Sequence, residues 1–356
     1  MTRAFAVIRP LLHTIPPETV HNLGVFALTH GLYPPAPSIA YPELVTHVLG
    51  LSFANPMGLA AGFDKNAVAI NGLLGQGFGF VEAGSVTPRP QPGNPKPRMF
   101  RLPEDQAVIN RLGFNNHGLA NFIKHYQQRN PLLGVAGANI GRNKDSQDAV
   151  SDYVTGLEAL YPYADYVTVN ISSPNTQGLR AMQQREALTE LLSALKTTQS
   201  ACEKQYQRKV PLLLKIAPDL EQDDLSDIAE VVLEQQMEGL IISNTTIQRS
   251  DLRSQSHTQE MGGLSGKPLF ALSTERLKQM YRLTQGAIPL VGVGGISSAE
   301  DAYQKIRSGA TLLQLYTAIV YNGFSVVQDI NHGLCSLLKR DGFTSVQQAV
   351  GVDASC

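Results

Sequence analysis

The sequence predicts an α/β protein, a closed (β/α)₈ TIM barrel preceded by a small N-terminal helical extension. Eight short apolar runs recur along the chain, and most of them precede a stretch with helical spacing of apolar residues. The runs are apolar throughout, which is typical of parallel strands covered on both faces. The 356 residues accommodate a barrel of roughly 250 residues plus an appendage. An open doubly wound sheet is the alternative, because periodicity does not show whether a sheet closes.

Composition narrows the class of protein further. Apolar residues make up 43% and charged residues 17%, which disfavours disordered, collagen-like and coiled-coil chains. The net charge of -1 provides no positive field for nucleic acid. Cys202, Cys335 and Cys356 are scattered and indicate neither a disulfide framework nor a zinc site. No run reaches the roughly 18 apolar residues of a membrane span, and we expect a chain that is neither exported nor membrane-spanning.

Residues 1–40 differ in character from the rest and are expected to form a separate extension. The spacing predicts two short helices at 3–13 and 18–31, followed by a Pro-rich linker at 32–38. The helix pair is apolar and slightly basic. It therefore fits either a cap on the barrel or a segment that rests on a lipid surface, and the pattern alone leaves both open.

The barrel is expected over residues 41–340, with a C-terminal tail at 341–356. The predicted strands, in chain order, are 57–62, 77–85, 132–141, 166–172, 210–218, 238–246, 288–296 and 310–318. Segments 185–205 and 219–237 place apolar residues three and four apart among charges and predict amphipathic helices. Five prolines in residues 88–100 predict a stiff, extended loop that serves the site.

Active sites of such barrels lie at the carboxyl ends of the strands, so the residues that end the runs are the candidates. They are amides, hydroxyls, small residues and one lysine: Ala61, Gly62, Ser85, Asn139, Asn170, Lys215, Ser243, Asn244, Thr245, Gly294, Gly295, Tyr316 and Thr317. Histidines and carboxylate pairs are missing from this set, which disfavours metal-dependent and glycoside hydrolysis. Asparagine amides suit a neutral heterocycle such as a pyrimidine-like ring or a flavin. A cofactor would have to carry the chemistry, and we expect no metal.

Glycine-rich segments and one lysine point to an anion. The string at 292–296, followed by a helix start at 297–301, fits a phosphate site, and 262–268 adds a second glycine-rich turn. Each alone fits an ordinary tight turn equally well. Lys215 follows three leucines at the edge of a covered sheet. It either meets an anionic partner, such as a reduced flavin ring, or reaches water at the barrel rim.

The segment 170–180 is the densest in polar side chains. Asn170 and Asn175 flank Ser173, whose backbone is restricted by Pro174. The same residues are common in ordinary turns. Neither a histidine nor an acid adjoins Ser173 in sequence, so a Ser-His-Asp hydrolase is not indicated.

Nine strings in order resemble the dihydroorotate dehydrogenases, from about residue 41 to 330. They are AAGFDK (60–65), GSVTPRPQPGNPKPR (84–98), NRLGFNN (110–116), NIGRNK (139–144), NISSPNT (170–176), KIAPD (215–219), SNTT (243–246), GGLSGKPL (262–269) and GVGGI (292–296). Within this family, the chain resembles the quinone-dependent, membrane-associated class 2 in two features. One is the helical extension, and the other is Ser173, where the soluble class has cysteine.

The resemblance implies FMN as cofactor, dihydroorotate as substrate and a membrane quinone as electron acceptor. The implied FMN residues are Ala61, Gly62, Lys65, Ser85, Asn139, Asn170, Lys215 and Ser243 around the ring and Gly266, Gly295, Tyr316 and Thr317 at the phosphate. The implied dihydroorotate residues are Lys65, Asn110, Arg111, Leu112, Gly113, Phe114, Asn170, Asn175, Asn244 and Thr245. His21, Arg101 and Tyr316 are implied at the quinone site.

The resemblance further implies that Ser173 is the general base that takes a proton from carbon 5 while hydride leaves carbon 6. A serine hydroxyl is too weak a base alone, so Thr176 is expected to begin a proton relay. The implied enzyme makes orotate for pyrimidine (UMP) synthesis as a peripheral protein on the cytoplasmic face of the inner membrane. Two alternatives stay open: a soluble relative with a dissolved acceptor, and a silent barrel that binds a phosphorylated ligand.

Overall fold

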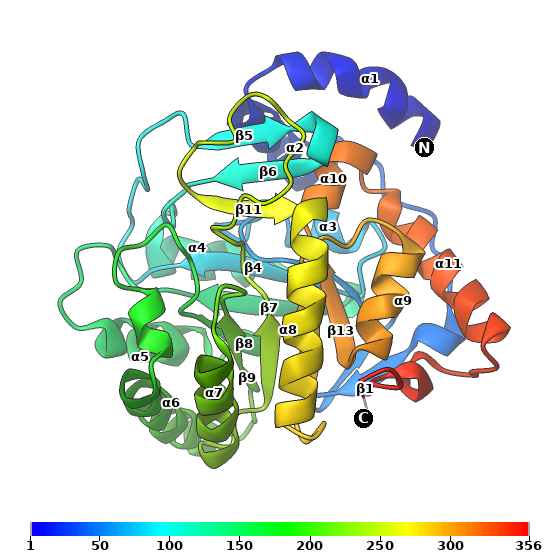
Figure 1. Ribbon diagram of the computed structural model, residues 1–356. Coiled ribbons are helices and arrows are strands. Elements are labelled where there is room, and N and C mark those ends of the chain that lie inside the picture. Colours follow the sequence, from blue (N-terminus) through cyan, green and yellow to red (C-terminus); the bar gives the residue numbers. More distant parts are fainter. Residues whose placement is uncertain (1, 355–356) are drawn as a thin grey trace.

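The computed structural model describes residues 2–354 and contains a closed barrel of eight parallel strands (Figure 1). Its strands follow one another around the barrel in chain order, and the last, β13, pairs with the first, β3. This pairing confirms the predicted barrel and excludes the open doubly wound sheet. Met1, Ser355 and Cys356, which belong to the predicted extension and tail, lie outside the described residues.

Each predicted strand is present but shorter than its apolar run. The barrel strands are β3 (Met57–Leu59), β4 (Phe80–Val86), β7 (Val135–Ile140), β8 (Tyr166–Asn170), β9 (Leu212–Ile216), β10 (Gly239–Ile242), β12 (Leu290–Val293) and β13 (Ala310–Leu315). Most of the runs continue past the sheet because their last residues turn into the loops above the barrel. Candidates such as Gly62, Ser243 and Gly295 lie in these loops, whereas Ser85, Asn139, Asn170 and Lys215 lie at or near the carboxyl ends of the strands themselves.

Helices surround the barrel as its outer layer (Figure 1). They are α3 (Ile70–Leu74), α4 (Gly118–Tyr126), α5 (Ala149–Leu160), α6 (Arg185–Tyr206), α7 (Gln222–Glu234), α8 (Phe270–Leu283), α9 (Ala299–Arg307), the short α10 (Thr317–Asn322) and α11 (Val326–Arg340). The predicted helices at 185–205 and 219–237 correspond to α6 and α7. Single 3-10 turns lie at Pro42–Leu44, Pro103–Asp105, Pro131–Leu133, Arg180–Gln183, Lys267–Leu269 and Val346–Ala349.

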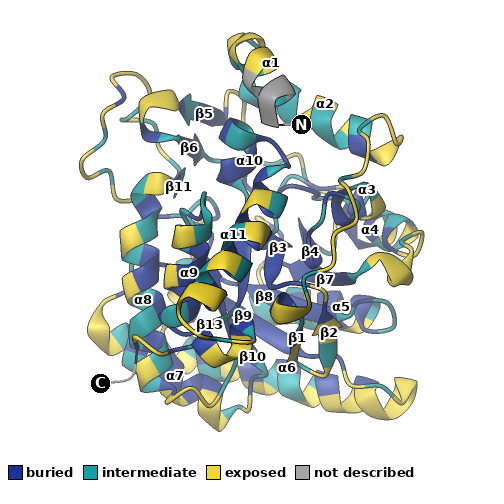
Figure 2. Ribbon diagram, turned by 90° about the vertical axis from the view of Figure 1, so that its right-hand side faces the viewer, coloured by how far each residue is buried: buried dark blue, intermediate teal, exposed yellow. Residues whose placement is uncertain are grey.

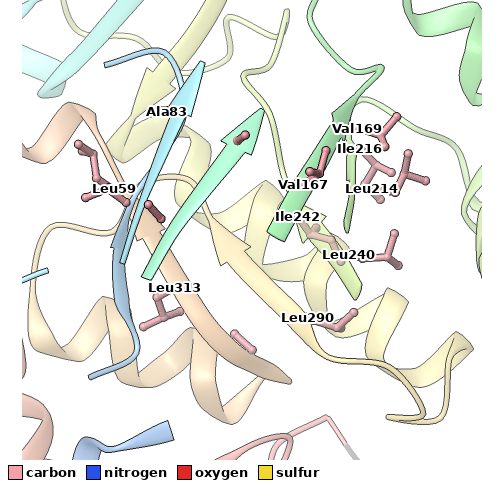
Figure 3. Packing of buried hydrophobic residues seen from close by; sticks show 14 of the residues in the cluster. Leu59, Ala83, Val167, Val169, Leu214, Ile216, Leu240, Ile242, Leu290 and Leu313 are labelled. Atoms are coloured by element: carbon pink, nitrogen blue, oxygen red, sulfur yellow. The ribbon is translucent and has the colours of Figure 1, made fainter. Parts of the chain in front are cut away.

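Two apolar layers stabilise the barrel. The larger lies between strands and helices, where residues such as Leu59, Val167 and Leu313 are buried (Figure 3). The smaller includes the rings of Phe80 and Tyr166, whose centroids lie 6.3 Å apart. Burial on both sides explains why these strands are apolar at consecutive positions.

A short hairpin that the sequence did not predict joins the smaller layer. Strands β1 (Thr46–Val48) and β2 (Leu51–Phe53) pair antiparallel, and the fully buried Phe53 packs edge-on against Phe80 with 5.3 Å between ring centroids. Three-residue strands carry too little periodic signal to be recognised in a sequence.

A second antiparallel sheet lies above the barrel in Figure 1 and corrects two expectations. It consists of β5 (Met99–Leu102), β6 (Ala107–Asn110) and β11 (Gly263–Gly266). The segment 262–268 was expected to be a turn, but it contributes β11; the loop expected at 88–100 ends in β5. Pairing of β11 with β6 joins segments about 150 residues apart, which local patterns do not reveal.

The extension forms the two predicted helices, α1 (Thr2–Thr14) and α2 (Pro17–Thr29); α2 packs against β5, and α1 lies at the top of the molecule in Figure 1, where it contacts α10. Figure 2 shows many exposed residues on them. Arg98 donates to Glu18 on α2 at 2.7 Å, and Arg101 donates to the backbone oxygen of Ile15 at 2.8 Å. The extension is therefore tied to the sheet through polar contacts as well as apolar packing.

The segment after α11 packs back onto the barrel. Arg307 on α9 forms a bidentate ion pair with Asp353, with distances of 2.7 and 2.6 Å. Arg282 donates to the backbone oxygen of Ala354 at 2.8 Å. Within residues 2–354, no helix has the length and apolar character needed to cross a membrane.

Candidate active site

A cavity of about 1350 Å³, its open mouth included, lies between the carboxyl ends of the barrel strands and the upper sheet. Most predicted site residues line it. They are Ala61, Gly62, Lys65, Ser85, Asn110, Leu112, Gly113, Phe114, Asn170, Ser173, Asn175, Lys215, Ser243, Asn244, Thr245, Gly266, Gly295, Tyr316 and Thr317.

Five predicted residues do not line the cavity. Asn139 lies behind Ser85, which donates to its side-chain oxygen. Thr176 is buried outside the cavity wall. Arg111 points elsewhere: it pairs with Glu260 at 2.6 Å and stacks over the ring of Phe100. The guanidinium of Arg111 is therefore paired outside the cavity wall, and the role of Arg111 within the substrate segment 110–114 stays a prediction.

The remaining two, His21 and Arg101, lie where the extension meets the rest of the protein. His21 is part of α2, and Arg101 donates to backbone oxygens at the carboxyl end of α1. The Nε atom of Arg101 is buried and has no partner among the described residues. One N–H of this guanidinium is thus available to a further acceptor.

Four side chains form a hydrogen-bonded chain that runs from the cavity wall, at Asn244 and Asn170, to the buried Asn139 and Glu82 behind it. Asn244 Nδ2 donates to Asn170 Oδ1 at 3.3 Å, Asn170 Nδ2 donates to Asn139 Oδ1 at 3.3 Å, and Asn139 Nδ2 donates to Glu82 Oε1 at 2.7 Å. A carboxylate only accepts, so Glu82 fixes which way each amide faces. The cavity therefore presents amide groups with a defined pattern of donors and acceptors.

Glu82 is a functional candidate that the sequence analysis missed. It is 1% exposed and also accepts hydrogen bonds from Tyr166, Thr168 and Gln314, at 3.1, 3.1 and 2.8 Å. A signal was available, because Glu82 is the one charged residue in the apolar run 77–85. Charged side chains are rarely buried completely without a partner that requires them.

Lys215 lies in the cavity wall and is 5% exposed. Burial lowers the pKa of Lys215, while the nearby charge of Glu82 raises it. Among the described residues, none accepts a hydrogen bond from its ammonium group. Because a buried cation without a partner is costly, this position suits a ligand that carries or develops negative charge.

The glycine-rich turn after β12 forms one end of the cavity. Gly294 and Gly295 have φ angles of +108° and +77°, which side chains rarely adopt. A Cβ atom at Gly295 would lie 2.5 Å from the Cβ of Phe270, so the turn lies directly on the first turn of α8. Within residues 2–354, the backbone N–H of Gly295 has no acceptor. This end therefore offers an unpaired backbone donor to an anion.

The loop that carries Ser173 is held in place by Arg180, another residue that the sequence analysis missed. The guanidinium donates to the backbone oxygens of Ser172 and Thr245, at 3.2 and 3.0 Å, and pairs with Asp219 at 2.9 Å. These partners follow three different barrel strands. Ser173 itself lines the cavity, and its Oγ accepts from the backbone N–H of Asn175 at 3.3 Å.

Lys65, His21 and Tyr316 form a contiguous set between barrel and extension. The Nζ atom of Lys65 lies 3.4 Å from His21 Nε2, and the hydroxyl of Tyr316 lies 3.4 Å from His21 Nδ1. Burial, with a smaller contribution from the charge of Lys65, lowers the pKa of His21 well below its usual value. A neutral imidazole can accept from Lys65 and donate to Tyr316 at the same time.

The donor set fits a flavin nucleotide better than a metal. Amides and hydroxyls match the donors and acceptors of a flavin ring, the unpaired lysine matches its reduced form, and the glycine turn matches a phosphate. No group of three or more His, Cys, Asp or Glu side chains able to hold a metal ion occurs in the described part of the chain.

Fold and cavity together define a class, the barrel enzymes that bind a nucleotide cofactor at the carboxyl ends of their strands. Comparisons with known proteins narrow this class. A sequence profile of the family "Dihydroorotate dehydrogenase" matches residues 43–338. The chain therefore belongs to the dihydroorotate dehydrogenase family, as its motifs predict.

Individual relatives cover nearly the whole chain. The chain is 52% identical to the dihydroorotate dehydrogenase (quinone) of Azorhizobium caulinodans, over 98% of this chain and 99% of that protein. It is 50% identical to the mitochondrial dihydroorotate dehydrogenase (quinone) of Oryza sativa, over 98% of this chain and 79% of that protein.

A solved structure shares the fold. The crystal structure of DHODH from Eimeria tenella in complex with ferulenol is 41% identical, with a TM-score of 0.91 and coverage of 96% of both chains. The similarity therefore includes the extension as well as the barrel.

Proposed function

We propose that this protein oxidises (S)-dihydroorotate to orotate in pyrimidine synthesis and passes the electrons to a membrane quinone. The observation that carries the proposal is the unpartnered, buried ammonium of Lys215, which faces the same cavity as Ser173 and the oriented amides. This arrangement supports a reaction in which negative charge develops on a ring held beside a hydroxyl. The relatives over nearly the whole chain are dihydroorotate dehydrogenases (quinone), which supports the substrate and the acceptor.

FMN is the cofactor that the cavity fits. The unpaired N–H of Gly295, together with Gly266, Tyr316 and Thr317, would hold its phosphate. The ring would lie among Ala61, Gly62, Lys65, Ser85, Asn170, Lys215 and Ser243, and Asn139 would act on it through Ser85. When bound, FMN supplies the two-electron chemistry, accepting hydride from carbon 6 of the substrate and returning electrons to the quinone.

Dihydroorotate would occupy the part of the cavity near Ser173. The ammonium of Lys65 would bind its carboxylate, and Asn170, Asn175 and Asn244 would offer amide groups to its ring. Ser173 acts as the base toward the proton on carbon 5, and the oriented amides keep that carbon beside its Oγ. Thr176, although outside the wall, is the proposed first acceptor in a relay from Ser173.

The quinone would enter where the extension meets the barrel. The cavity reaches Val320 and Tyr321 on α10, whose backbone oxygens contact His13 and Arg9 of α1. His21 and Tyr316 lie between this end and Lys65, and the free N–H of Arg101 suits a quinone carbonyl. The path therefore runs beneath α1 and α2.

The extension also suits a membrane surface. Large apolar side chains are exposed on it and on the linker: Val7, Ile8, Leu11, Leu23, Phe26 and Leu32, each at 50% or more. Such a patch favours peripheral attachment, which we place on the cytoplasmic face of the inner membrane.

An anaerobic titration tests the proposal. The purified protein is expected to be yellow, to lose its flavin absorbance when dihydroorotate is added without oxygen, and to regain it when a short-chain ubiquinone follows. A folded protein without flavin would overturn the cofactor assignment. Bleaching that only a dissolved dye reverses would instead favour a soluble relative.

A further inference from the structure

Lys305 on α9 is a fully buried cation outside the cavity wall. Its ammonium donates to Ser273 Oγ at 2.8 Å and to Thr274 Oγ1 at 3.0 Å, and it lies 5.1 Å from the centroid of the Phe270 ring. Two of its protons are used in hydrogen bonds, and the ring face attracts the charge. All three contacted residues lie on the first turn of α8.

No carboxylate pairs with this lysine among the described residues. The carboxylate whose charge raises the pKa of Lys305 is that of Asp301. It already accepts hydrogen bonds from the backbone N–H groups of Ser297 and Ser298, at 2.8 and 3.1 Å. Burial lowers the pKa of Lys305 to about 7, and Asp301 opposes this only in part. A buried ammonium that lacks an ion pair costs free energy that a methionine would not.

The contacts of Lys305 lead to the glycine turn. Ser273, which accepts from the ammonium, lies 3.1 Å from the backbone oxygen of Gly294 and 3.1 Å from that of Phe270, and its one proton is shared between these two acceptors. The peptide bond between Gly294 and Gly295 is trans, so its C=O and N–H point in opposite directions. The carbonyl faces Ser273 and Lys305, and the N–H of Gly295 faces away from them, toward the anion end of the cavity.

This geometry aligns charge and dipole. The positive ammonium lies behind the negative end of the Gly294–Gly295 peptide dipole, and a phosphate would lie before its positive end. We propose that Lys305 is a positioning residue for the phosphate site, which orients the Gly294–Gly295 peptide and makes the protein select a phosphorylated flavin. The inference rests on the proposed function, since it assumes that a flavin binds in this cavity.

The test compares two flavins that differ only in the phosphate. Apoprotein stripped of flavin is titrated with FMN and with riboflavin at about pH 6, where Lys305 is charged, and binding is followed by quenching of flavin fluorescence. In Lys305→Met, the Kd for FMN is expected to rise roughly tenfold or more, and the Kd for riboflavin to change less than about threefold. Because the charge is buried, the FMN effect is expected to persist in 0.5 M salt, an ionic strength at which the Debye length is roughly 4–5 Å.

Two further variants keep the result interpretable. Ser273→Ala retains the ammonium but removes the link to Gly294, and should weaken FMN binding selectively, by a smaller factor. Lys278→Met removes a partly exposed lysine from α8 and should change neither Kd. If Lys305→Met does not fold, Ser273→Ala alone decides the question. A larger loss of affinity for FMN than for riboflavin would show that the contact between Ser273 and Gly294 contributes to binding of the phosphate.

Equal losses for FMN and riboflavin would show that Lys305 only supports packing, and unchanged binding of FMN would also overturn the inference. Failure of the wild-type protein to bind either flavin would instead refute the proposed function.

Discussion

Ser173 lies in the cavity wall, and within residues 2–354 its hydroxyl accepts a hydrogen bond from the backbone N–H of Asn175 and has no histidine or carboxylate as a hydrogen-bond partner. Its proposed role as general base therefore depends on the position of its hydroxyl relative to the substrate, and not on a neighbouring histidine or carboxylate that would take its proton. Arg180, which holds the loop through Ser172, Thr245 and Asp219, supplies that placement.

Replacing Ser173 by alanine should slow flavin reduction by dihydroorotate about 10²-fold or more, the usual contribution of a general base. Stopped-flow absorbance under anaerobic conditions measures this rate. Ser173→Cys should recover activity as pH rises through about 8.5, because the thiolate is the effective base. An unchanged rate in Ser173→Ala with FMN bound would remove the role assigned to the serine.

Lys65 predicts a pH dependence of ligand binding. Burial lowers the pKa of Lys65 to about 8, although Glu18 and Asp64 act in the opposite direction. The side chain is charged below this pH and becomes neutral above it, so affinity for the carboxylate of orotate should fall as pH rises through about 8. Perturbation of the flavin spectrum by orotate between pH 6.5 and 9 measures the Kd.

The matched variant is Lys65→Met, which should bind orotate weakly with a flat profile over the same range. A wild-type Kd that does not change with pH would contradict the assignment of Lys65 to the carboxylate.

Among the elements, the barrel strands depend on glycines that make room for rings. A Cβ atom at Gly137 on β7 would lie 2.1 Å from the ring of Tyr166, which is held by its hydrogen bond to Glu82. Gly137→Ala should therefore lower the free energy of unfolding by about 1–3 kcal/mol. A Cβ atom added at Gly24 on α2 would meet no described atom within 4 Å. Gly24→Ala should therefore be neutral or stabilising by up to about 1 kcal/mol.

Denaturant unfolding of the flavin-loaded protein measures both variants. A Gly137→Ala protein as stable as the wild type would show that the Tyr166 ring moves away without cost.

The two helices of the extension are expected to serve the quinone step alone, whereas the barrel carries the reduction of flavin. Removing residues 1–35 deletes α1, α2 and His21, whereas Ser173, Lys215 and the amide chain remain. Quinone turnover should fall about tenfold or more, because the acceptor loses its binding surface, while reduction of flavin by dihydroorotate continues. A dissolved dye as acceptor serves as the control, and intact quinone turnover would refute the proposed entry path.

At the scale of the whole molecule, the exposed apolar side chains of the extension determine how the protein meets a membrane. Leu11 on α1 is 68% exposed, and its replacement by glutamate should reduce binding to phosphatidylethanolamine–phosphatidylglycerol vesicles about tenfold, the effect of one lost apolar anchor. Leu132, 91% exposed in the turn that precedes β7, is the matched control. Equal effects of Leu11→Glu and Leu132→Glu in co-sedimentation would show that the extension is not the attachment surface.

Patterns within short segments were enough to predict the barrel, both extension helices and most of the cavity lining. Continuous apolar runs are a direct consequence of burial on both faces, and the carboxyl ends of parallel strands must meet at one end of a barrel. Ser173, Lys215 and Gly295 could therefore be found without a structure.

Contacts between distant segments were decided only by the tertiary structure. The pairing of β11 with β6, the Arg98–Glu18 ion pair, the convergence of three strand ends on Arg180, and the position of Lys305 behind the glycine turn all join residues far apart in the chain. Arg111, by contrast, matched the motif but points away from the cavity. The physical reason is common to all of them: a sequence records which side chains are polar or apolar, whereas the direction and partner of a buried polar group depend on the packing of every element around it.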